Sequence, residues 1–260
     1  MHFTAKADVE VLKALPAGGP PPFDFAAAPW SACQGHAPFV FQQSDLAVRE
    51  QTTVRLLYDD AHLHIGIACA LEKPVPDPGP VAHQGEHVEV FLDPGNTRTA
   101  SLQFAVNAAG ATFGFDHRQP ESETTRTPWW QGWTAETRRA DDRWEILIRI
   151  PLSKPPADGE LWGLNVFRCH VNLRGVSSWH SYSEGFDAPE EYGVFAFGTA
   201  PVASLPEELR PVRWPARVPA RPLEYHLTVD PPDDFLGWEL DPARLENYFR
   251  FFADWGVKRI

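Results

Sequence analysis

One aromatic side chain, Trp179, lies in a polar loop between charged residues. Arg168 precedes it on a predicted strand, and Asp187 and Glu190 follow it in a Phe-Asp-x-Pro-Glu turn. A flat ring packs against the C–H face of a sugar, while charged groups hydrogen-bond with its hydroxyls. The spacing therefore predicts a sugar-binding site. The alternative is that Trp179 closes one end of a hydrophobic core.

Glu89 is a second candidate for ligand binding. In the alternating run 87–92, Glu89 and Phe91 share one face of a strand, and the valines and leucine share the other. This pattern predicts a half-buried polar site, with a solvent-facing carboxylate or an ion pair with Arg168 as the alternative. A guanidinium can bind two neighbouring hydroxyls or a carboxylate, so Arg168 is either a ligand-binding residue or part of a structural ion pair.

A tryptophan-rich loop supplies further aromatic candidates. Trp129, Trp130 and Trp133 follow Pro128 within five residues, too close together for all three to enter one core. We therefore expect at least one of them to cap the end of a β-sandwich or to line a ligand site.

The sequence offers little support for hydrolysis. Ser177, Ser178 and His180 are neighbours with Asp187 nearby, but no nucleophile elbow is present, and adjacency in sequence is not triad geometry. Glu89 and Glu184 are the acids that a glycosidase would need as a pair. We expect the chain alone to be non-catalytic.

Metal sites have only weak candidates. His62 and His64 lie on one strand face, with Cys69 or His170 as further ligands, but ordinary surface and core histidines explain them better. We expect no cofactor other than calcium. Calcium is considered because oxygen donors are clustered in two turns. These weak calcium candidates are Asp59, Asp60, Asp93 and Asn96.

Short alternating runs bounded by turn signals recur along the chain and predict a mainly β fold, an antiparallel β-sandwich. An alternating run within residues 1–15 predicts an edge strand, and no helix is expected before residue 200. The other predicted strands are 53–58, 62–70, 87–92, 100–107, 111–115, 134–139, 143–150, 164–171 and 192–197.

The predicted domain order is a sandwich over residues 1–198, a proline-rich linker over 199–222 and a strand-helix extension over 223–260. Six prolines with scattered charge mark the linker. In the extension, Asp241-Pro242 begins a helix whose apolar residues follow 3.6-residue spacing and end at Gly256.

The composition of the chain limits the classes of partner that it can bind. With 23 Lys and Arg against 35 Asp and Glu, the net charge of −12 disfavours nucleic acid and anionic membranes. No run of 18 apolar residues is present, so no membrane span is expected. No signal peptide is apparent, which leaves the location unknown and cytoplasmic by default. The three cysteines match no zinc spacing, and Cys69 and Cys169 are expected as buried thiols.

The series of motifs resembles family 9-like carbohydrate-binding modules, relatives of the cytochrome-binding DOMON sandwiches. The resemblance covers about residues 53–197. The matching motifs are VRLLYDDAHLHIGIAC, GEHVEVFLDPG, LQFAVNAAGATFG, RWEILIRIPLS, LWGLNVFRC, SSW and FDAPEEYGVFAF.

The resemblance implies a sandwich that binds sugar chains between two aromatics, often binds structural calcium and often accompanies a glycoside hydrolase. It places Trp179 at a clamp position and Glu89 on the acidic strand, with Gln103, Asn107 and Arg168 on neighbouring strands. The second clamp position holds no Trp here. His83 could stack instead, or Trp129 or Trp130 could reach in from the later loop.

Three functions stay open on this basis. The first is a carbohydrate-binding module of a glycan-active protein, whose catalytic domain lies in a longer or neighbouring chain. The second is a structural sandwich that binds no sugar, and the third is a haem or redox DOMON-like module. The tail over residues 223–260 resembles the first βα unit of an α/β barrel.

Overall fold

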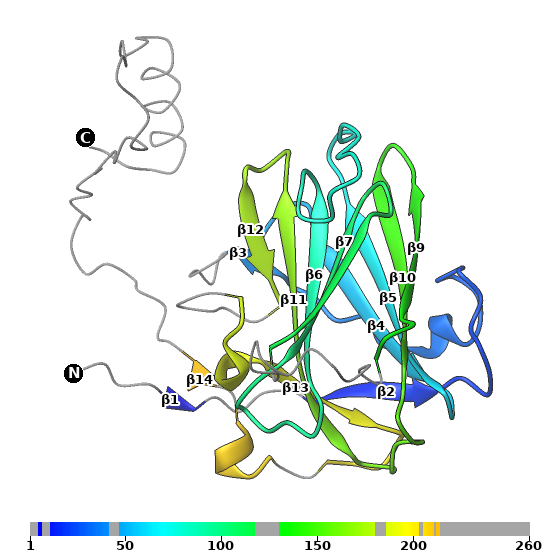
Figure 1. Ribbon diagram of the computed structural model, residues 1–260, viewed down its shortest axis with the longest axis vertical. Coiled ribbons are helices and arrows are strands. Elements are labelled where there is room, and N and C mark those ends of the chain that lie inside the picture. Colours follow the sequence, from blue (N-terminus) through cyan, green and yellow to red (C-terminus); the bar gives the residue numbers. More distant parts are fainter. Residues whose placement is uncertain are drawn as a thin grey trace. The chain divides into compact units, whose positions relative to one another are not determined.

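The structure is a computed structural model of the 260-residue chain (Figure 1). It describes residues 5–6, 11–41, 47–117, 130–179, 186–202, 205–210 and 212–213. The chain divides into two compact units, Met1–Ala216 and Arg217–Ile260, and the described residues all belong to the first. The predicted extension over 223–260, together with Trp129, His180 and Glu184, lies outside the described residues.

Strands dominate the described residues, and their only helices are short 3-10 turns. None of these turns approaches the length or apolarity of a membrane-spanning helix. The strands are β1 (Ala5–Lys6), β2 (Leu12–Pro16), β3 (Val40–Phe41), β4 (Thr52–Tyr58), β5 (His62–Ala70), β6 (His87–Asp93), β7 (Leu102–Asn107), β8 (Thr112–Asp116), β9 (Thr134–Arg139), β10 (Arg143–Pro151), β11 (Leu161–His170), β12 (Gly175–Ser178), β13 (Gly193–Phe197) and β14 (Val212–Arg213). The 3-10 turns are η1 (Trp30–Ala32), η2 (Pro189–Glu191) and η3 (Glu207–Leu209).

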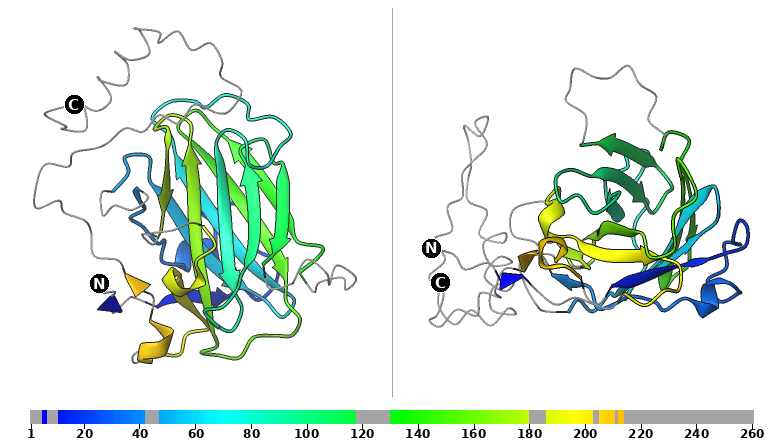
Figure 2. Two further views of the ribbon diagram at one scale, coloured as in Figure 1. Left: turned by 60° about the vertical axis from the view of Figure 1, so that its left-hand side comes forward. Right: turned by 90° about the horizontal axis from the view of Figure 1, so that it is seen from below.

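Twelve of these strands form one continuous sheet that folds over on itself (Figures 1 and 2). Strands β8, β7, β6, β11 and β13 make the first layer, and β2, β4, β5, β10 and β9 make the second, while β12 and β3 extend the first layer beside β11. The two ends of the sheet approach each other, since a Cβ added at Gly110 after β7 would lie 3.2 Å from Thr137 Oγ1 of β9. The mainly β sandwich is thus confirmed, in a nearly closed form.

The place of β2 differs from the prediction. The sequence predicts an edge strand and a wholly antiparallel sheet, but β2 lies between β13 and β4 and runs parallel to both. Every other strand pair in the described sheet is antiparallel. The alternation of a short run identifies a strand but not its partners, which here lie about 40 and 180 residues further along the chain.

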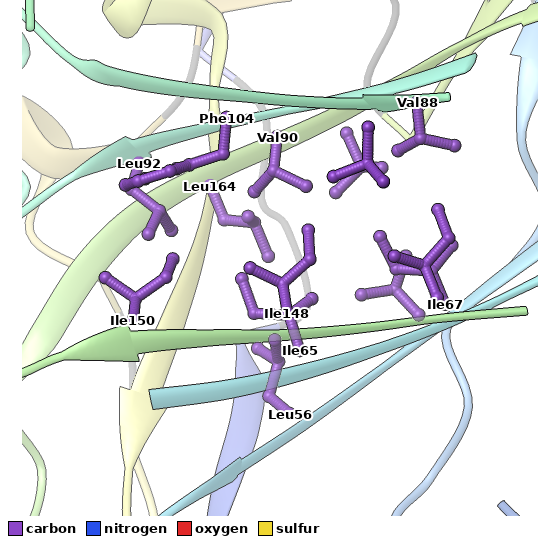
Figure 3. Close-up of a cluster of buried hydrophobic side chains, with 14 of the residues drawn as sticks. Leu56, Ile65, Ile67, Val88, Val90, Leu92, Phe104, Ile148, Ile150 and Leu164 are labelled. Carbon is purple, nitrogen blue, oxygen red and sulfur yellow. The ribbon is translucent and has the colours of Figure 1, made fainter. Parts of the chain in front are cut away.

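The core fills the space between the layers (Figure 3). Alternation places the inner side chains of both layers face to face, and each of those labelled in Figure 3 is at most 1% exposed. Burial of each such side chain contributes about 1.5–3 kcal/mol. They are Val88, Val90, Leu92, Phe104 and Leu164 of the first layer and Leu56, Ile65, Ile67, Ile148 and Ile150 of the second.

A proline-rich arm covers the outer face of the second layer. Phe23, Trp30 and Cys33 pack there on Leu57 and Leu147. The indole N–H of Trp30 donates to the carbonyl of Pro22 at 2.7 Å, which satisfies the one polar group that this ring buries. The outer face of the second layer is therefore occupied by the chain itself.

The segment after β13 returns to the sandwich. Strand β14 pairs with β1. The sequence assigned β14 to the linker and β1 to the run predicted as an edge strand. The half-buried Arg98 donates to the carbonyls of Pro189, Tyr192 and Leu209, which ties η2 and η3 to the loop after β6.

Candidate functional site

Polar and aromatic side chains gather on the outer face of β6, β7 and β8. Phe91 pairs with Gln103, and Gln103 pairs in turn with Phe115. Because paired residues project to the same side of a sheet, Glu89 and Phe113 share this face as well. We call this group the β6–β8 cluster. It comprises His83, His87, Glu89, Gln103, Phe113, Phe115, His117 and the nearby Asp187.

A chain of hydrogen bonds runs across the cluster. Gln103 Nε2 donates to Glu89 Oε2 at 2.6 Å, and Gln103 Oε1 lies 3.1 Å from His117 Nε2. His117 Nδ1 lies 3.0 Å from Asp187 Oδ2, and Ser101 Oγ donates to Asp187 Oδ1 at 2.6 Å. Glu89 and Gln103 are thereby oriented on neighbouring strands, and Asp187 is oriented in the loop before η2.

Glu89 is ionised between two imidazoles. Its Oε1 lies 3.5 Å from His83 Nδ1 and 3.3 Å from His87 Nε2. Burial opposes ionisation, but hydrogen bonds from His87 and Gln103 and the charges of the histidines outweigh it, so the pKa of Glu89 is lowered. Burial likewise disfavours the charge on His87, but hydrogen bonds with Cys169 and Glu89 raise its pKa to about 10.

Aromatic rings form a row along β8 next to these polar groups. Phe113 and Phe115 are 41% and 46% exposed, and their rings are nearly parallel, 6° apart with centroids 6.4 Å apart. His83 and His117 each meet one of these rings edge-on at 4.8 Å. The result is an apolar surface beside convergent hydrogen-bonding groups.

Sequence reasoning missed Phe113 and Phe115, although the sequence contains a signal for them. The inner positions of β8 hold Thr112 and Gly114, and the phenylalanines stand at the outer positions. Gly114 is required there, because a Cβ would lie 2.8 Å from Trp133 Nε1. An edge strand with small residues inside and large aromatics outside inverts the usual pattern.

The tryptophans predicted as platforms are elsewhere. Trp179 is half-buried and packs against the main core, with its ring 6.5 Å from that of His36. Trp130 is 8% exposed, meets Phe104 edge-on and donates its indole N–H to Asp116 Oδ2 at 3.2 Å. Trp130 therefore lies in the core.

Arg168 faces the core and not Glu89. It pairs with Val88 on β6, is fully buried, and donates to Glu86 Oε1 at 2.6 Å and to the carbonyls of Glu50 and Ala70. The structural ion pair considered for Arg168 is present, with the carboxylates of Glu86 at 2.6 Å and Glu50 at 3.7 Å as partners.

Asn107 is also occupied by the fold. Its side-chain N–H groups donate to the carbonyls of Gly79 and Val81, and its Oδ1 accepts from the backbone of Ala109 and Ala111. Among the residues predicted to bind ligand, Glu89, Gln103, His83 and Asp187 are thus brought together, and Trp179, Trp130 and Arg168 are not. Asn107 pairs with His87 and shares the face of the cluster, but its polar groups are bonded within the fold.

The calcium candidates lie in two turns. Asp59 accepts from the backbone of Ala61 and His62, and Asp60 is exposed. Asp93 accepts from Thr97 Oγ1 and the backbone of Arg98. Asn96 Oδ1 and Asp93 Oδ2 would lie 3.3 Å and 3.5 Å from a Cβ added at Gly163, so these two oxygens are close to each other. A calcium site here stays a prediction.

Comparison with solved structures identifies the fold. A carbohydrate-binding module family 9 protein from Caldicellulosiruptor kristjanssonii, in complex with glucose, superposes with a TM-score of 0.56 at 17% identity. The match covers 74% of this chain and 97% of that one. The fold is that of family 9 carbohydrate-binding modules.

Two further structures share this family 9 fold. A family 9 module from the same organism, in complex with cellotriose, has a TM-score of 0.55 at 16% identity, covering 76% of this chain and 98% of that one. A protein from Bacteroides uniformis has a TM-score of 0.54 at 17% identity, covering 74% and 100%. No family model matches the sequence. Curated proteins gave no match either.

Proposed function

We propose that the sandwich is a non-catalytic carbohydrate-binding module and that the β6–β8 cluster is its binding surface. The observation that carries the proposal is the exposed ring pair Phe113 and Phe115 beside the Glu89–Gln103 pair. The bound glucose and cellotriose of the family 9 neighbours support a sugar as the ligand.

Each part of the surface has a separate task in this proposal. Sugar C–H faces pack on Phe113 and Phe115, whose nearly parallel rings offer an exposed apolar surface. The carboxylate of Glu89 and the groups of Gln103 and His117 accept from or donate to hydroxyls. Because these groups already have partners in the free protein, we expect weak affinity, with Kd of about 10⁻³ to 10⁻⁵ M.

Trp179 is the second candidate platform, as the resemblance implies, and one titration series separates the two. Binding of glucose and cellotriose is measured by calorimetry for the wild type, F113A/F115A, E89Q and W179A. We expect F113A/F115A and E89Q each to weaken binding roughly tenfold, or about 1.4 kcal/mol. W179A should lower stability and leave Kd unchanged, because its ring packs against the core.

Glu136→Gln is the matched control for E89Q, since Glu136 is an exposed strand carboxylate on the second layer. If W179A alone removes binding from a folded protein, the platform is Trp179 and the assignment to β8 is wrong.

A structural sandwich without sugar binding is the second candidate function. It is favoured by Arg168 and Asn107, whose polar groups are bonded within the fold. A glycan array that stays blank with correctly folded protein would support it, and a visible absorption band would support the haem alternative. For the sugar-binding function, a catalytic domain in a longer or neighbouring chain is the expected partner.

A further inference from the structure

Three side chains at one end of the β6–β8 cluster converge on a single point. His83 Nδ1, His87 Nε2 and Glu89 Oε1 all lie within 4.8 Å of one another. Two of the separations are 3.5 Å and 3.3 Å. In a tetrahedral zinc site with bonds of about 2.0–2.1 Å, neighbouring ligand atoms lie about 3.3 Å apart. Two edges of the triangle therefore already have the length that a bound zinc ion requires.

The groups behind these ligands hold them in the required orientation. His87 Nδ1 lies 2.9 Å from the carbonyl oxygen of Gly85, so Nδ1 carries the donated hydrogen and Nε2 faces Glu89. Gln103 donates to Glu89 Oε2, which leaves Oε1 for the two imidazoles. Metal-binding histidines and carboxylates are usually fixed by such second partners.

The three side chains differ in their burial. The side chains of His87 and Glu89 are 8% and 7% exposed, whereas that of His83 is 38% exposed. Two ligands are thus anchored in the sheet, and the third stands on a surface loop where an ion can enter. The imidazole centroids of His83 and His87 are 6.0 Å apart, which suits two rings approaching one ion from different sides.

We propose that His83, His87 and Glu89 bind a divalent transition metal ion, with zinc the best match to this donor set. Two imidazoles and a carboxylate are borderline ligands that favour zinc and its neighbours over calcium or magnesium. Three protein ligands leave one position of a tetrahedral ion for water or a ligand group. Glu89 also belongs to the proposed sugar surface, so the site would add a cation beside it.

The test is a titration of the full chain with Co²⁺, followed by its visible absorption, and with Zn²⁺, followed by calorimetry. Metal and proton compete for the imidazoles, so all titrations are run at one pH. We expect one ion per chain and a tetrahedral Co²⁺ spectrum. His83→Ala and Glu89→Gln should each weaken binding roughly tenfold or more. His83 is on a surface loop, so its loss should not prevent folding.

His62→Ala is the matched control, because His62 is also a histidine beside a carboxylate, 3.7 Å from Asp59. This variant should bind like the wild type. Absence of a tetrahedral Co²⁺ spectrum, or equal binding by wild type and His83→Ala, would overturn the metal site. Sugar titrations in the presence of a chelator keep the proposals apart, since sugar binding without metal binding refutes only the site proposed here.

Discussion

At the level of single residues, burial and interaction partners together determine the role of each charged side chain. Arg168 and Glu89 lie on adjacent strands, yet one faces the core and the other the outer surface. The sequence pattern places Glu89 correctly on the face of Phe91, because strand alternation is local. It does not reveal that Glu86, from the loop before β6, neutralises Arg168, because that contact spans 82 residues.

His87 gives stability a pH dependence. Its pKa is raised to about 10 because bonds with Cys169 and Glu89 outweigh its burial. The usual value of 6.5 applies in the unfolded chain. The contribution of the charged form is therefore complete below about pH 6.5 and is lost as pH rises through about 10. We expect the free energy of unfolding, measured in urea with a chelator present, to decline over this range.

His87→Gln should flatten that decline, while His62→Gln, on the opposite layer, should retain it. Parallel curves for the wild type and His87→Gln would show that the Glu89–His87 contact does not stabilise the folded protein.

At the level of elements, the sandwich has two unequal outer faces. The arm with Phe23 and Trp30 covers the second layer, and the first layer keeps two phenylalanines exposed. The sequence predicts β5 and β9 to the residue. β5 is an alternating run, and β9 is followed by the turn at Asp141-Asp142. It does not predict β12, since Gly-Val-Ser-Ser lacks a long enough pattern to indicate a strand.

Gly66 on β5 tests whether the arm is an integral part of the fold. A Cβ at this position would lie 2.7 Å from the ring of Phe25 and 3.0 Å from that of Trp30. Gly66→Ala should therefore push the arm outward and destabilise the protein by about 1–3 kcal/mol. Denaturant unfolding measures this change.

Gly175→Ala on β12 is the control, because its added Cβ would meet its nearest atom, in Phe41, at 3.5 Å, an ordinary contact. We expect a change within about 0.5 kcal/mol for it. Equal stabilities of the two variants would mean that the arm does not pack tightly.

At the level of the whole molecule, truncation can locate the end of the first unit. The prediction of a sandwich ending at residue 198 follows from the change in composition, but described residues beyond 198 contact the sandwich. Leu205 is buried, and Lys13 donates to the carbonyl of Ala200. Composition indicates where proline begins to dominate, but it does not indicate whether an extended segment packs.

Two truncations locate the boundary. A chain ending at Ala216 should keep the melting temperature of the full protein within about 2 °C, because it retains η3 and β14. A chain ending at Gly198 loses the Leu209 carbonyl that binds Arg98 and the burial of Leu205. We expect a loss of about 2 kcal/mol, or roughly 4–8 °C, measured by calorimetry. Equal melting temperatures for both truncations would place the boundary at 198.

The position of β2 between β4 and β13 determines how long this strand waits for its second partner during synthesis. Its neighbour β4 leaves the ribosome soon after it, but its other neighbour, β13, begins at residue 193. At about 5–20 residues per second, the side of β2 that pairs with β13 stays unpaired for roughly 10–40 s. An unpaired strand edge is a template for association with other chains. Nascent chains of this protein are therefore expected to need a chaperone until β13 emerges and joins the two layers.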